Sequence, residues 1–467
     1  MKNLSLIIVF FIVLLLIAGC NEIAPVSSDK SGPDQAASLA KPSGDIGIIN
    51  PGTYLLYAPA WSDKQSDAVI KAGGKVTFSD PESGFGIAYS DDVNFASKAK
   101  KSSAFTGVIA DRIISWQKPI ETIEFKENAV PNPPNEPFMK FQWNLTALET
   151  EAAWAEGYTG LGVRVAVLDG GISANHIDIA PNLDAAASGS FVPGYNFDQD
   201  TEEAEEFLHA THVAGIIAAP ANSRGTIGVA PEATIIAVKV LDGGSGAFSW
   251  VLQGILYASL SRNEGGAGAD IINLSMSGII PKNNRDSAQL LAIFNRVVNT
   301  AAQRGVLVIS AAGNEGFNFD HSWNYVILPA EAGNGIAVSA TGPVGFAFGS
   351  TNFRDFASYS NSGNSLVSFA APGGDDQLYD GPGWYFDMIL SPCFVSATSY
   401  VYAWSAGTSM SAPAAAGVAA LIKQKYPDIT VAGLKAKLAQ TADDEGKPGH
   451  DPYYGHGFVN ARRAVTE

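Results

Sequence analysis

Val163-Arg164-Val165-Ala166-Val167-Leu168 is the stretch of sequence from which the fold can be inferred. A nearly continuous apolar run of this kind is typical of a strand that is buried on both faces of a parallel sheet. Similar runs follow at 234–240, 271–274 and 306–309. Their alternation with helical patterns predicts a large α/β domain with a mostly parallel sheet. The expected helices are 250–261, 288–304 and 411–426.

The composition of the 467-residue chain indicates a folded protein with an acidic surface. Hydrophobic residues make up 46% of the chain and charged residues 16%, a balance typical of globular rather than disordered proteins. The formal net charge is −17, which argues against nucleic acid as a partner, because phosphate contacts require clustered Lys and Arg. The length allows two or three domains.

The N-terminus has the pattern of an export signal. A basic start at Lys2 precedes an apolar run from Leu4 to Ala18, which is too short for an ordinary membrane span. The run ends at Gly19-Cys20 and resembles the bacterial lipobox, although Ile17 stands where that motif prefers Leu. We expect residues 1–20 to be a lipoprotein signal peptide with lipid on Cys20, so that the protein is exported and anchored to a membrane of the cell envelope. An uncleaved anchor and a plain secretory signal are the alternatives.

The remaining chain divides into four parts by pattern. Residues 21–49 are rich in Ser, Ala, Asp, Pro and Gly, which predicts a flexible tether. Residues 50–117 show strand and helix signals in the order β-α-β-β-α-β, the ferredoxin-like split unit. Five prolines in 118–137 predict an exposed linker. Residues 138–467 carry the large α/β pattern.

Three motifs stand at the ends of elements in the large domain, where open α/β sheets place their binding sites. Asp169 ends the first strand, His209 opens a helical segment, and Ser409 lies in a loop that leads into an Ala-rich helix. A serine hydroxyl is a weak nucleophile near neutral pH, so an imidazole must take its proton during attack. A buried carboxylate then holds the tautomer of the imidazole and stabilises its charged form. This trio predicts nucleophilic catalysis by Ser409.

A fourth motif places Asn314 among small residues directly after an apolar strand. A carboxamide N–H at such a position can bind the oxyanion that develops during acyl transfer, with the backbone N–H of Ser409 as its partner.

Together these motifs, in the order Asp, His, Asn and Ser, resemble those of the subtilisin-like serine peptidases over almost all of residues 138–467. An α/β-hydrolase would instead require Gly-x-Ser-x-Gly and the order Ser, Asp, His. The resemblance implies a subtilisin-like three-layer domain that hydrolyses peptide bonds of proteins through an acyl-enzyme. It also implies that Asp169, His209 and Ser409 form the catalytic triad and that Asn314 stabilises the oxyanion. Two small residues depart from the family pattern, Gly170 and Ala210, and we expect them to tune activity rather than abolish it.

The resemblance further implies two backbone edges between which a substrate peptide pairs as an added strand. One edge is Gly244-Ser245-Gly246, and the other is Ser275-Met276-Ser277-Gly278, in which Ser277 replaces the usual Gly. The opposite wall of the pocket for the residue before the cut would be formed by Ala311, Ala312 and Gly313. Small walls leave room for a large apolar side chain, whereas Glu315 at the rim favours a basic one, and both preferences stay open.

No cofactor is expected for catalysis, but a structural calcium ion is one interpretation of a pair of oxygen-bearing residues. Asp178 and Asn222 match the principal calcium site of the family, in which carbonyls of Pro220, Arg224 and Thr226 would complete the cage. Simple capping of the loop is the alternative. The acidic run between 198 and 206 is expected to be a solvated loop, with a second cation as the alternative.

By position and strand order, residues 50–117 are similar to the family's propeptide, an intramolecular chaperone and inhibitor. We expect its removal somewhere between 118 and 140, which would leave the lipid anchor on the propeptide side. The cut would release a monomeric peptidase unless the two pieces stay associated. Residues 373–404 exceed the expected length and are predicted to form a flap near the cleft.

A catalytically silent protein that binds peptides on the same fold is the alternative function. The presence of all four catalytic residue types favours an active peptidase.

Overall fold

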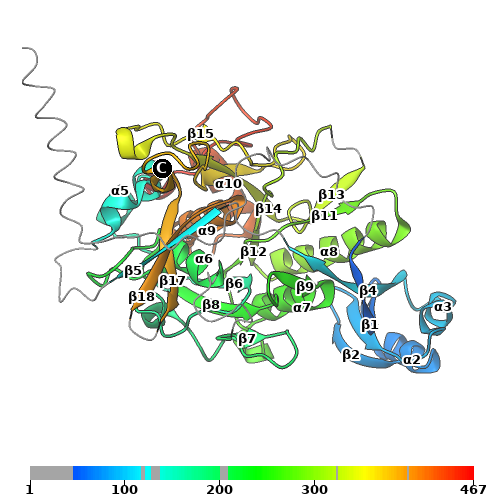
Figure 1. Cartoon of the computed structure of the whole chain (residues 1–467). Coiled ribbons are helices and arrows are strands. Elements are labelled where there is room, and N and C mark those ends of the chain that lie inside the picture. The colour runs from blue at the N-terminus through cyan, green and yellow to red at the C-terminus, as the bar shows by residue number, and fades with distance from the viewer. Residues whose placement is uncertain (1–45, 117–120, 128–136, 200–208, 322–323, 397–398) are drawn as a thin grey trace, which may run out of the picture.

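The computed structural model describes residues 46–116, 121–127, 137–199, 209–321, 324–396 and 399–467 (Figure 1). The expected signal peptide, most of the tether and most of the acidic run lie outside these residues. Among the residues described, no helix is long and apolar enough to cross a membrane.

A mostly parallel sheet forms the centre of the large domain. Its strand order is β15-β14-β12-β10-β6-β8-β7, with β16 beside β14, and only β15 pairs antiparallel. The predicted α/β class is therefore confirmed. The strands are β6 (Arg164–Asp169), β7 (Gly189–Ser190), β8 (Thr234–Lys239), β10 (Ile271–Leu274), β12 (Leu307–Ala311), β14 (Ile336–Gly342), β15 (Asp355–Phe356) and β16 (Phe369–Pro372).

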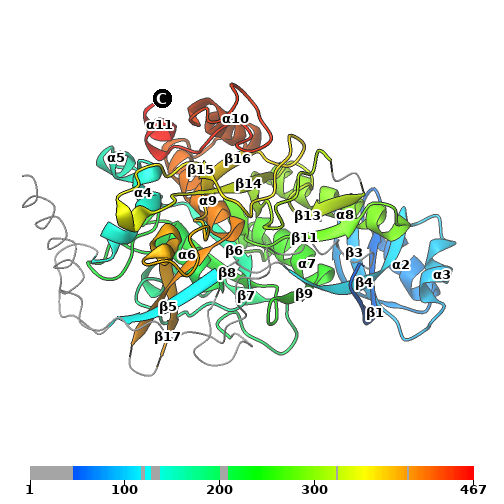
Figure 2. The same ribbon diagram turned by 45° about the horizontal axis from the view of Figure 1, so that its top comes forward.

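Helices cover both faces of this sheet and produce three layers (Figures 1 and 2). Val165 and Val167 of β6 belong to the core under α6 (His209–Ala218) and α9 (Thr408–Lys425). Their neighbours Ala166 and Leu168 belong to the core under α7 and α8. Because successive side chains of a strand point to opposite faces, a strand covered on both sides must be apolar throughout. The covering helices of the second face are α7 (Phe248–Ser259) and α8 (Arg285–Gln303).

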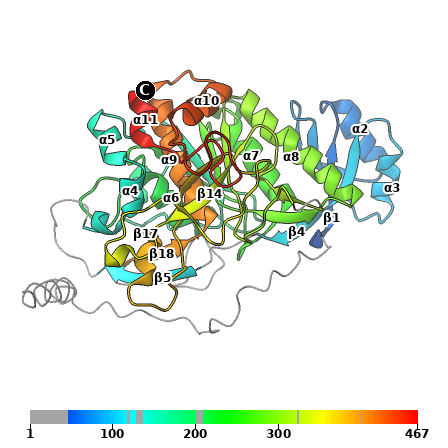
Figure 3. The same ribbon diagram turned by 90° about the horizontal axis from the view of Figure 1, so that it is seen from above.

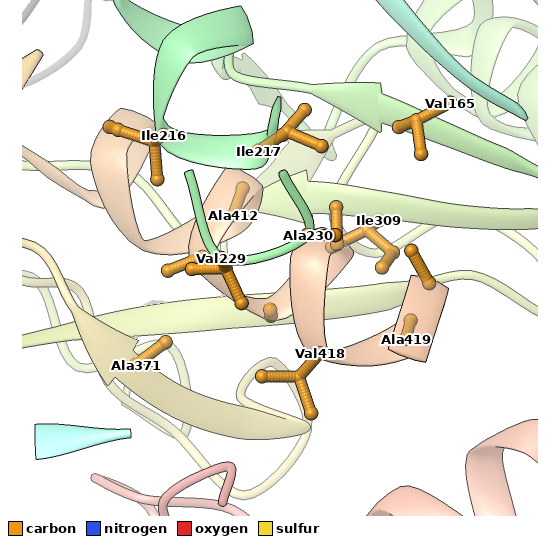
Figure 4. Close-up of a cluster of buried hydrophobic side chains, with 14 of the residues drawn as sticks. Val165, Ile216, Ile217, Val229, Ala230, Ile309, Ala371, Ala412, Val418 and Ala419 are labelled. Atoms are coloured by element: carbon orange, nitrogen blue, oxygen red, sulfur yellow. The ribbon is translucent and has the colours of Figure 1, made fainter. Parts of the chain in front are cut away.

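Small residues let α9 lie close to its neighbours. Ala412 and Ala419 are fully buried and pack near Val229 and Ile309 (Figure 4). At Gly417, an added Cβ would lie 2.5 Å from the Cβ of Val229, so only glycine fits there. The helix that carries Ser409 is thus fixed by close packing along most of its length.

The N-terminal module has the element order predicted from its sequence. Four antiparallel strands lie in the order β2-β3-β1-β4. The module packs beside α8 (Figure 3), where Arg304 at the C-terminal end of that helix forms ion pairs with Asp80 at 2.6 Å and Glu82 at 2.8 Å. Its elements are β1 (Ile48–Tyr57), α2 (Asp63–Lys71), β2 (Lys75–Asp80), β3 (Phe85–Tyr89), α3 (Phe95–Lys100) and β4 (Gly107–Ser115).

The region predicted to be a linker contains a strand that the sequence analysis missed. β5 (Glu121–Glu127) pairs antiparallel with β18 (Tyr400–Ala406), and β17 (Ile389–Val395) completes a three-stranded sheet. The prolines of 118–137 all lie outside β5, so they flank the strand without interrupting its ladder.

The hairpin of β17 and β18 corrects the expectation of a flap at 373–404. Residues of both strands are buried against α6, where the Nε2 atom of His212 donates to the carbonyl oxygens of Ile389 and Ala403 at 3.1 and 3.0 Å. The hairpin is therefore part of the packed domain. The other helices and strands are α4 (Trp143–Ala147), α5 (Thr150–Ala155), β9 (Ser245–Ala247), β11 (Gly278–Pro281), β13 (Tyr325–Leu328), α10 (Val431–Thr441) and α11 (Ala461–Thr466).

Candidate active site

Asp169 and His209 meet at the carboxyl end of β6. The Nδ1 atom of His209 lies 2.9 Å from each carboxylate oxygen of Asp169. Asp169 is only 1% exposed, and the N–H of Gly170 also donates to it at 2.7 Å. Since a carboxylate can only accept, Nδ1 carries a hydrogen, so Nε2 is the nitrogen that is basic when the ring is neutral.

Ser409 is held at the same edge of the sheet by Ser275, which directly follows β10. The hydroxyl of Ser409 donates to the carbonyl oxygen of Ser275 at 3.1 Å. In return, the hydroxyl of Ser275 donates to the carbonyl oxygen of Ser409 at 2.7 Å and accepts from Asn273 at 2.9 Å. Parallel strands present their carboxyl ends at one edge, so β6 and β10 bring Asp169 and Ser275 together although they lie far apart in the sequence.

Asn314 is oriented by the residue that precedes the predicted nucleophile. Its amide oxygen accepts from the backbone N–H of Thr408 at 2.8 Å and from the hydroxyl of Thr408 at 2.7 Å. Thr408 in turn accepts from the N–H of Gly313 at 3.0 Å. Two donors fix the oxygen end of the amide, so its NH₂ group faces away from Thr408.

Comparison with known proteins identifies the family to which the chain belongs. Residues 160–457 match the family model described as Subtilase family, Peptidase_S8. The chain belongs to the subtilase family. A subtilisin from Bacillus pumilus is 36% identical over 327 residues, which cover 69% of this chain and 98% of that protein. These matches show that the chain is a serine-type endopeptidase of this family.

Solved structures agree with this assignment. A protease structure from Pseudoalteromonas arctica is 31% identical, has a TM-score of 0.56 and covers 71% of this chain and 98% of that one. The epidermin leader peptide processing serine protease of Staphylococcus aureus covers 88% of this chain and 97% of its own, with a TM-score of 0.69. Its identity of 20% shows the shared fold alone.

One expected substrate edge of this subtilase is paired with its own N-terminal module. The end of β4 lies antiparallel to β9, with Ile114 opposite Gly246 and Ser115 opposite Ser245 (Figure 2). The backbone N–H of Trp116 donates to the carbonyl oxygen of Gly244 at 2.9 Å, and its ring N–H donates to Gly246 at 3.2 Å. The edge therefore pairs with an added strand of the same chain, and its binding of substrate stays a prediction.

The second expected edge lies across from the same strand. An added Cβ on Gly278 would come within 2.5 Å of the side chain of Ile114 and 3.5 Å of the ring of Trp116. Residues 114–116 thus pass between the two stretches that were predicted to bind substrate. The predicted pocket residues are Ala311, at the end of β12, and Ala312 and Gly313, directly after it. Ser277, which precedes Gly278 in the sequence, is buried.

Asn361 holds residues of the predicted pocket wall in place and was missed from the sequence. Its side chain donates to the carbonyl oxygen of Ala312 at 2.9 Å and to the carboxylate of Glu315 at 2.6 Å. Its oxygen accepts from the N–H of Phe317 at 2.9 Å. No motif marks Asn361, whereas Thr408 and Asn273 carry a weak signal, because each is a polar residue beside or within an apolar buried segment.

The expected calcium residues use their oxygens in hydrogen bonds. The carboxylate of Asp178 accepts from the N–H of Thr226 at 2.9 Å and from the amide of Asn222 at 3.1 Å. The oxygen of Asn222 accepts from the N–H of Arg224 at 2.9 Å. A cation would need Asn222 to present oxygen rather than N–H to the same space. At Gly225, an added Cβ would collide with the hydroxyl of Tyr402 beside Asp178. This donor set fits a capped loop better than a calcium site.

Proposed function

We propose that this subtilase hydrolyses peptide bonds of proteins with Ser409 as the nucleophile, His209 as the general base and then acid, and Asp169 as the group that orients His209. The observation that carries the proposal is the contact of His209 Nδ1 with both oxygens of a buried Asp169. With its hydrogen on Nδ1, the neutral ring would accept a proton at Nε2, as a general base requires.

The chemistry follows from these positions. The Ser409 hydroxyl now donates to Ser275, so its proton must be redirected to His209 as oxygen attacks the peptide carbonyl. The carbonyl oxygen then becomes an oxyanion, for which the Asn314 NH₂ group and the N–H of Ser409 are the proposed donors. His209 returns the proton to the leaving amine, and an acyl-enzyme on Ser409 remains. Water, deprotonated by His209, attacks the acyl carbon, and His209 returns the proton to the Ser409 oxygen as the new carboxyl end leaves.

The N-terminal module is proposed to be an intramolecular inhibitor. Residues 114–116 lie where an extended substrate would pair, which supports blockage of the cleft. The carboxylate of Asp111 accepts from the N–H of Ser249 at 3.1 Å and from its hydroxyl at 2.6 Å, at the N-terminal end of α7. A carboxylate at a helix N-terminus is favourable for the helix dipole, so this contact holds the module in place.

Maturation is proposed to cut the chain between Trp116 and Glu121. The chain before this interval pairs with β9, and the chain after it pairs with β18, which leads directly into the nucleophile. The interval 117–120 itself lies outside the described residues. These two pairings favour the N-terminal end of the range of 118–140 expected from the sequence. Export, lipid on Cys20 and release of a monomeric peptidase remain proposals that rest on the sequence alone.

The proposed function can be tested by expressing the full chain and its S409A variant. We expect the parent chain to shorten to a form that degrades casein, and N-terminal sequencing to place its start between residues 117 and 121. The S409A chain should stay at full length and be inactive. Processing of S409A in a purified sample would show that another protease performs the cut. A correctly processed parent without proteolytic activity would favour the silent peptide-binding alternative.

A further inference from the structure

β18 is the strand that leads into the nucleophile, and a strand of the precursor covers its edge. All seven residues of β5 pair with it, from Glu121 opposite Ala406 to Glu127 opposite Tyr400 (Figures 1 and 3). Ala406 is three residues before Ser409. Because the pairing is antiparallel, β5 begins near the nucleophile and runs away from it, in the direction that the carboxyl side of a cleaved chain would take.

The residues on either side of the proposed cut pair with two different strands of the peptidase domain. Trp116, at the end of the chain that pairs with β9, and Glu121, at the start of β5, are five residues apart. An extended chain of this length spans at most about 18 Å. The stretch before the cut therefore pairs with one edge of the site, and the stretch after it pairs with β18.

Among the strands that the structure describes, only β5 covers this edge of β18. Its sequence, Tyr400-Val401-Tyr402-Ala403-Trp404-Ser405-Ala406, contains neither charge nor proline. Exposed edge strands usually carry Lys, Pro or inward-pointing charges that prevent pairing with other chains. In this hairpin the one proline, Pro392, lies on β17, on the far side of β18. An edge without such protection is suited to accept a strand.

Contacts other than β5 hold β18 in place. It is paired with β17 on its other side, and His212 of α6 donates to the carbonyl oxygen of Ala403. The Nε2 atom of His176 lies 3.2 Å from the carbonyl oxygen of Val401. These anchors come from the peptidase domain, so the edge keeps its position when β5 departs.

We propose that β18 is a docking strand for the segment of a protein substrate that follows the cleaved bond. The proposal rests on the peptidase function proposed above. β5 is the first occupant, in the precursor, and stays at the N-terminus of the cut enzyme, where it competes with substrates for the same edge. Backbone pairing is tolerant of sequence, so the ligand is an extended polypeptide several residues long rather than a particular motif. Long, unfolded chains are thereby preferred over short peptides.

Quenched fluorescent peptides test this inference. The series keeps one sequence before the cut and extends the part after it from about two to about eight residues, slightly longer than a β5-sized strand. The enzyme is the matured T122G/I123G/F125G variant of the full chain. The three glycines lower the strand propensity of β5, so that β5 leaves the edge of β18 open to substrate. We expect kcat/KM to rise at least about tenfold with length. N-methylation of alternate downstream amides should cancel the rise in one register and spare it in the other.

Two controls separate this inference from the underlying function. A short anilide substrate, which has no residues after the cut, should be hydrolysed equally by the variant, by the parent and by L161G, a glycine substitution at an exposed site 60% accessible to solvent. Labelling of Ser409 by a fluorophosphonate reports the peptidase function by itself. If the variant is labelled and cleaves the anilide, but kcat/KM does not depend on downstream length or on N-methylation, the docking strand is wrong and the peptidase proposal stands.

Discussion

Ser275 and Ser409 exchange hydrogen bonds, each donating its hydroxyl to the backbone carbonyl oxygen of the other, at 2.7 Å from Ser275 and 3.1 Å from Ser409. The pair joins the carboxyl end of β10 to the first turn of α9. The position of Ser409, the proposed nucleophile, is consequently set by the central sheet, and its hydroxyl is held in a defined direction.

Replacement of Ser275 by alanine should weaken this connection. The carbonyl oxygen of buried Ser409 would lose its donor, and an unsatisfied buried polar group costs about 1–3 kcal/mol. We expect the free energy of unfolding to fall by that amount and kcat to fall by roughly tenfold, since a small misplacement of a nucleophile slows attack. Urea unfolding and anilide hydrolysis measure both. S287A, in α8 and outside the site, serves as the matched control. Unchanged kcat in S275A would show that the exchange has no positioning role.

Loss of the Asn314 amide should lower kcat with little effect on KM. Removal of one oxyanion donor costs about 10²–10³ in kcat, a figure measured in subtilisin, which is a member of this family. The N314A variant removes the donor, but it also removes the acceptor for Thr408. N314D retains an acceptor for Thr408 and lacks the NH₂ group, so it isolates the donor. A decrease in kcat below about tenfold in both variants would contradict the assigned role.

Two buried histidines should make the fold sensitive to acid. Burial lowers the pKa of His176 to about 4 and that of His212 to about 3. Both pKa values in the folded protein lie below the value in the unfolded chain, about 6.5. At pH values between the folded and the unfolded pKa, the unfolded state therefore binds more protons than the folded state. Stability is therefore present above about pH 6.5 and is lost as pH falls towards 4.

The H212Q variant separates this effect from other titrating groups. Glutamine retains a donor for the two carbonyl oxygens and cannot titrate. In the inactive S409A background, urea unfolding between about pH 7 and pH 4 should show a shallower loss of stability for H212Q than for its parent. Asp111, whose pKa is raised chiefly by burial, acts in the opposite direction in both proteins and cancels in the comparison. Equal slopes would exclude His212 as a source of acid sensitivity.

The Asp111 carboxylate should prolong the life of the inhibited complex after the chain is cut. Hydrogen bonds to a charged group contribute about 1.5–3 kcal/mol, so their loss in D111A should speed release of the module by roughly 10–100-fold. The lifetime can be followed by the recovery of anilide hydrolysis after maturation. D67N, on the exposed face of α2, is the control. An unchanged lifetime in D111A would remove this contact from the account of inhibition.

Chelation should leave the thermal stability of the matured enzyme unchanged. The oxygens of Asp178 and Asn222 already accept hydrogen bonds from the protein, so no calcium ion is needed to satisfy them. Thermal unfolding with and without a chelator provides the measurement. A clear fall in Tm that added Ca²⁺ reverses would favour the calcium interpretation of these residues over the capped loop.

The sequence predicts the parts of the site whose patterns are local. Asp169 ends a strand whose apolar run requires burial on both faces, and the order of the N-terminal module follows from its turns, including Gly73-Gly74 after α2. The four motif residues could be singled out because each lies beside a strong strand or helix signal, and their catalytic roles stay predictions.

Features that depend on distant partners could not be predicted. β5 is short, and its partner β18 lies near the other end of the chain. The hydrogen bonds of Asn222 and the approach of Tyr402 to Gly225 depend on how three segments pack, and no local pattern encodes that arrangement. For the same reason, the buried hairpin of β17 and β18 was predicted as a flap.

The central claim, that Ser409 is the activated nucleophile, is tested most directly by mass spectrometry of the matured enzyme after reaction with a fluorophosphonate. The account predicts one phosphonylated peptide, modified at Ser409, with labelling that is lost in S409A and strongly slowed in H209A. Fully matured, folded protein that remains unlabelled, or that is labelled at another residue, would contradict it.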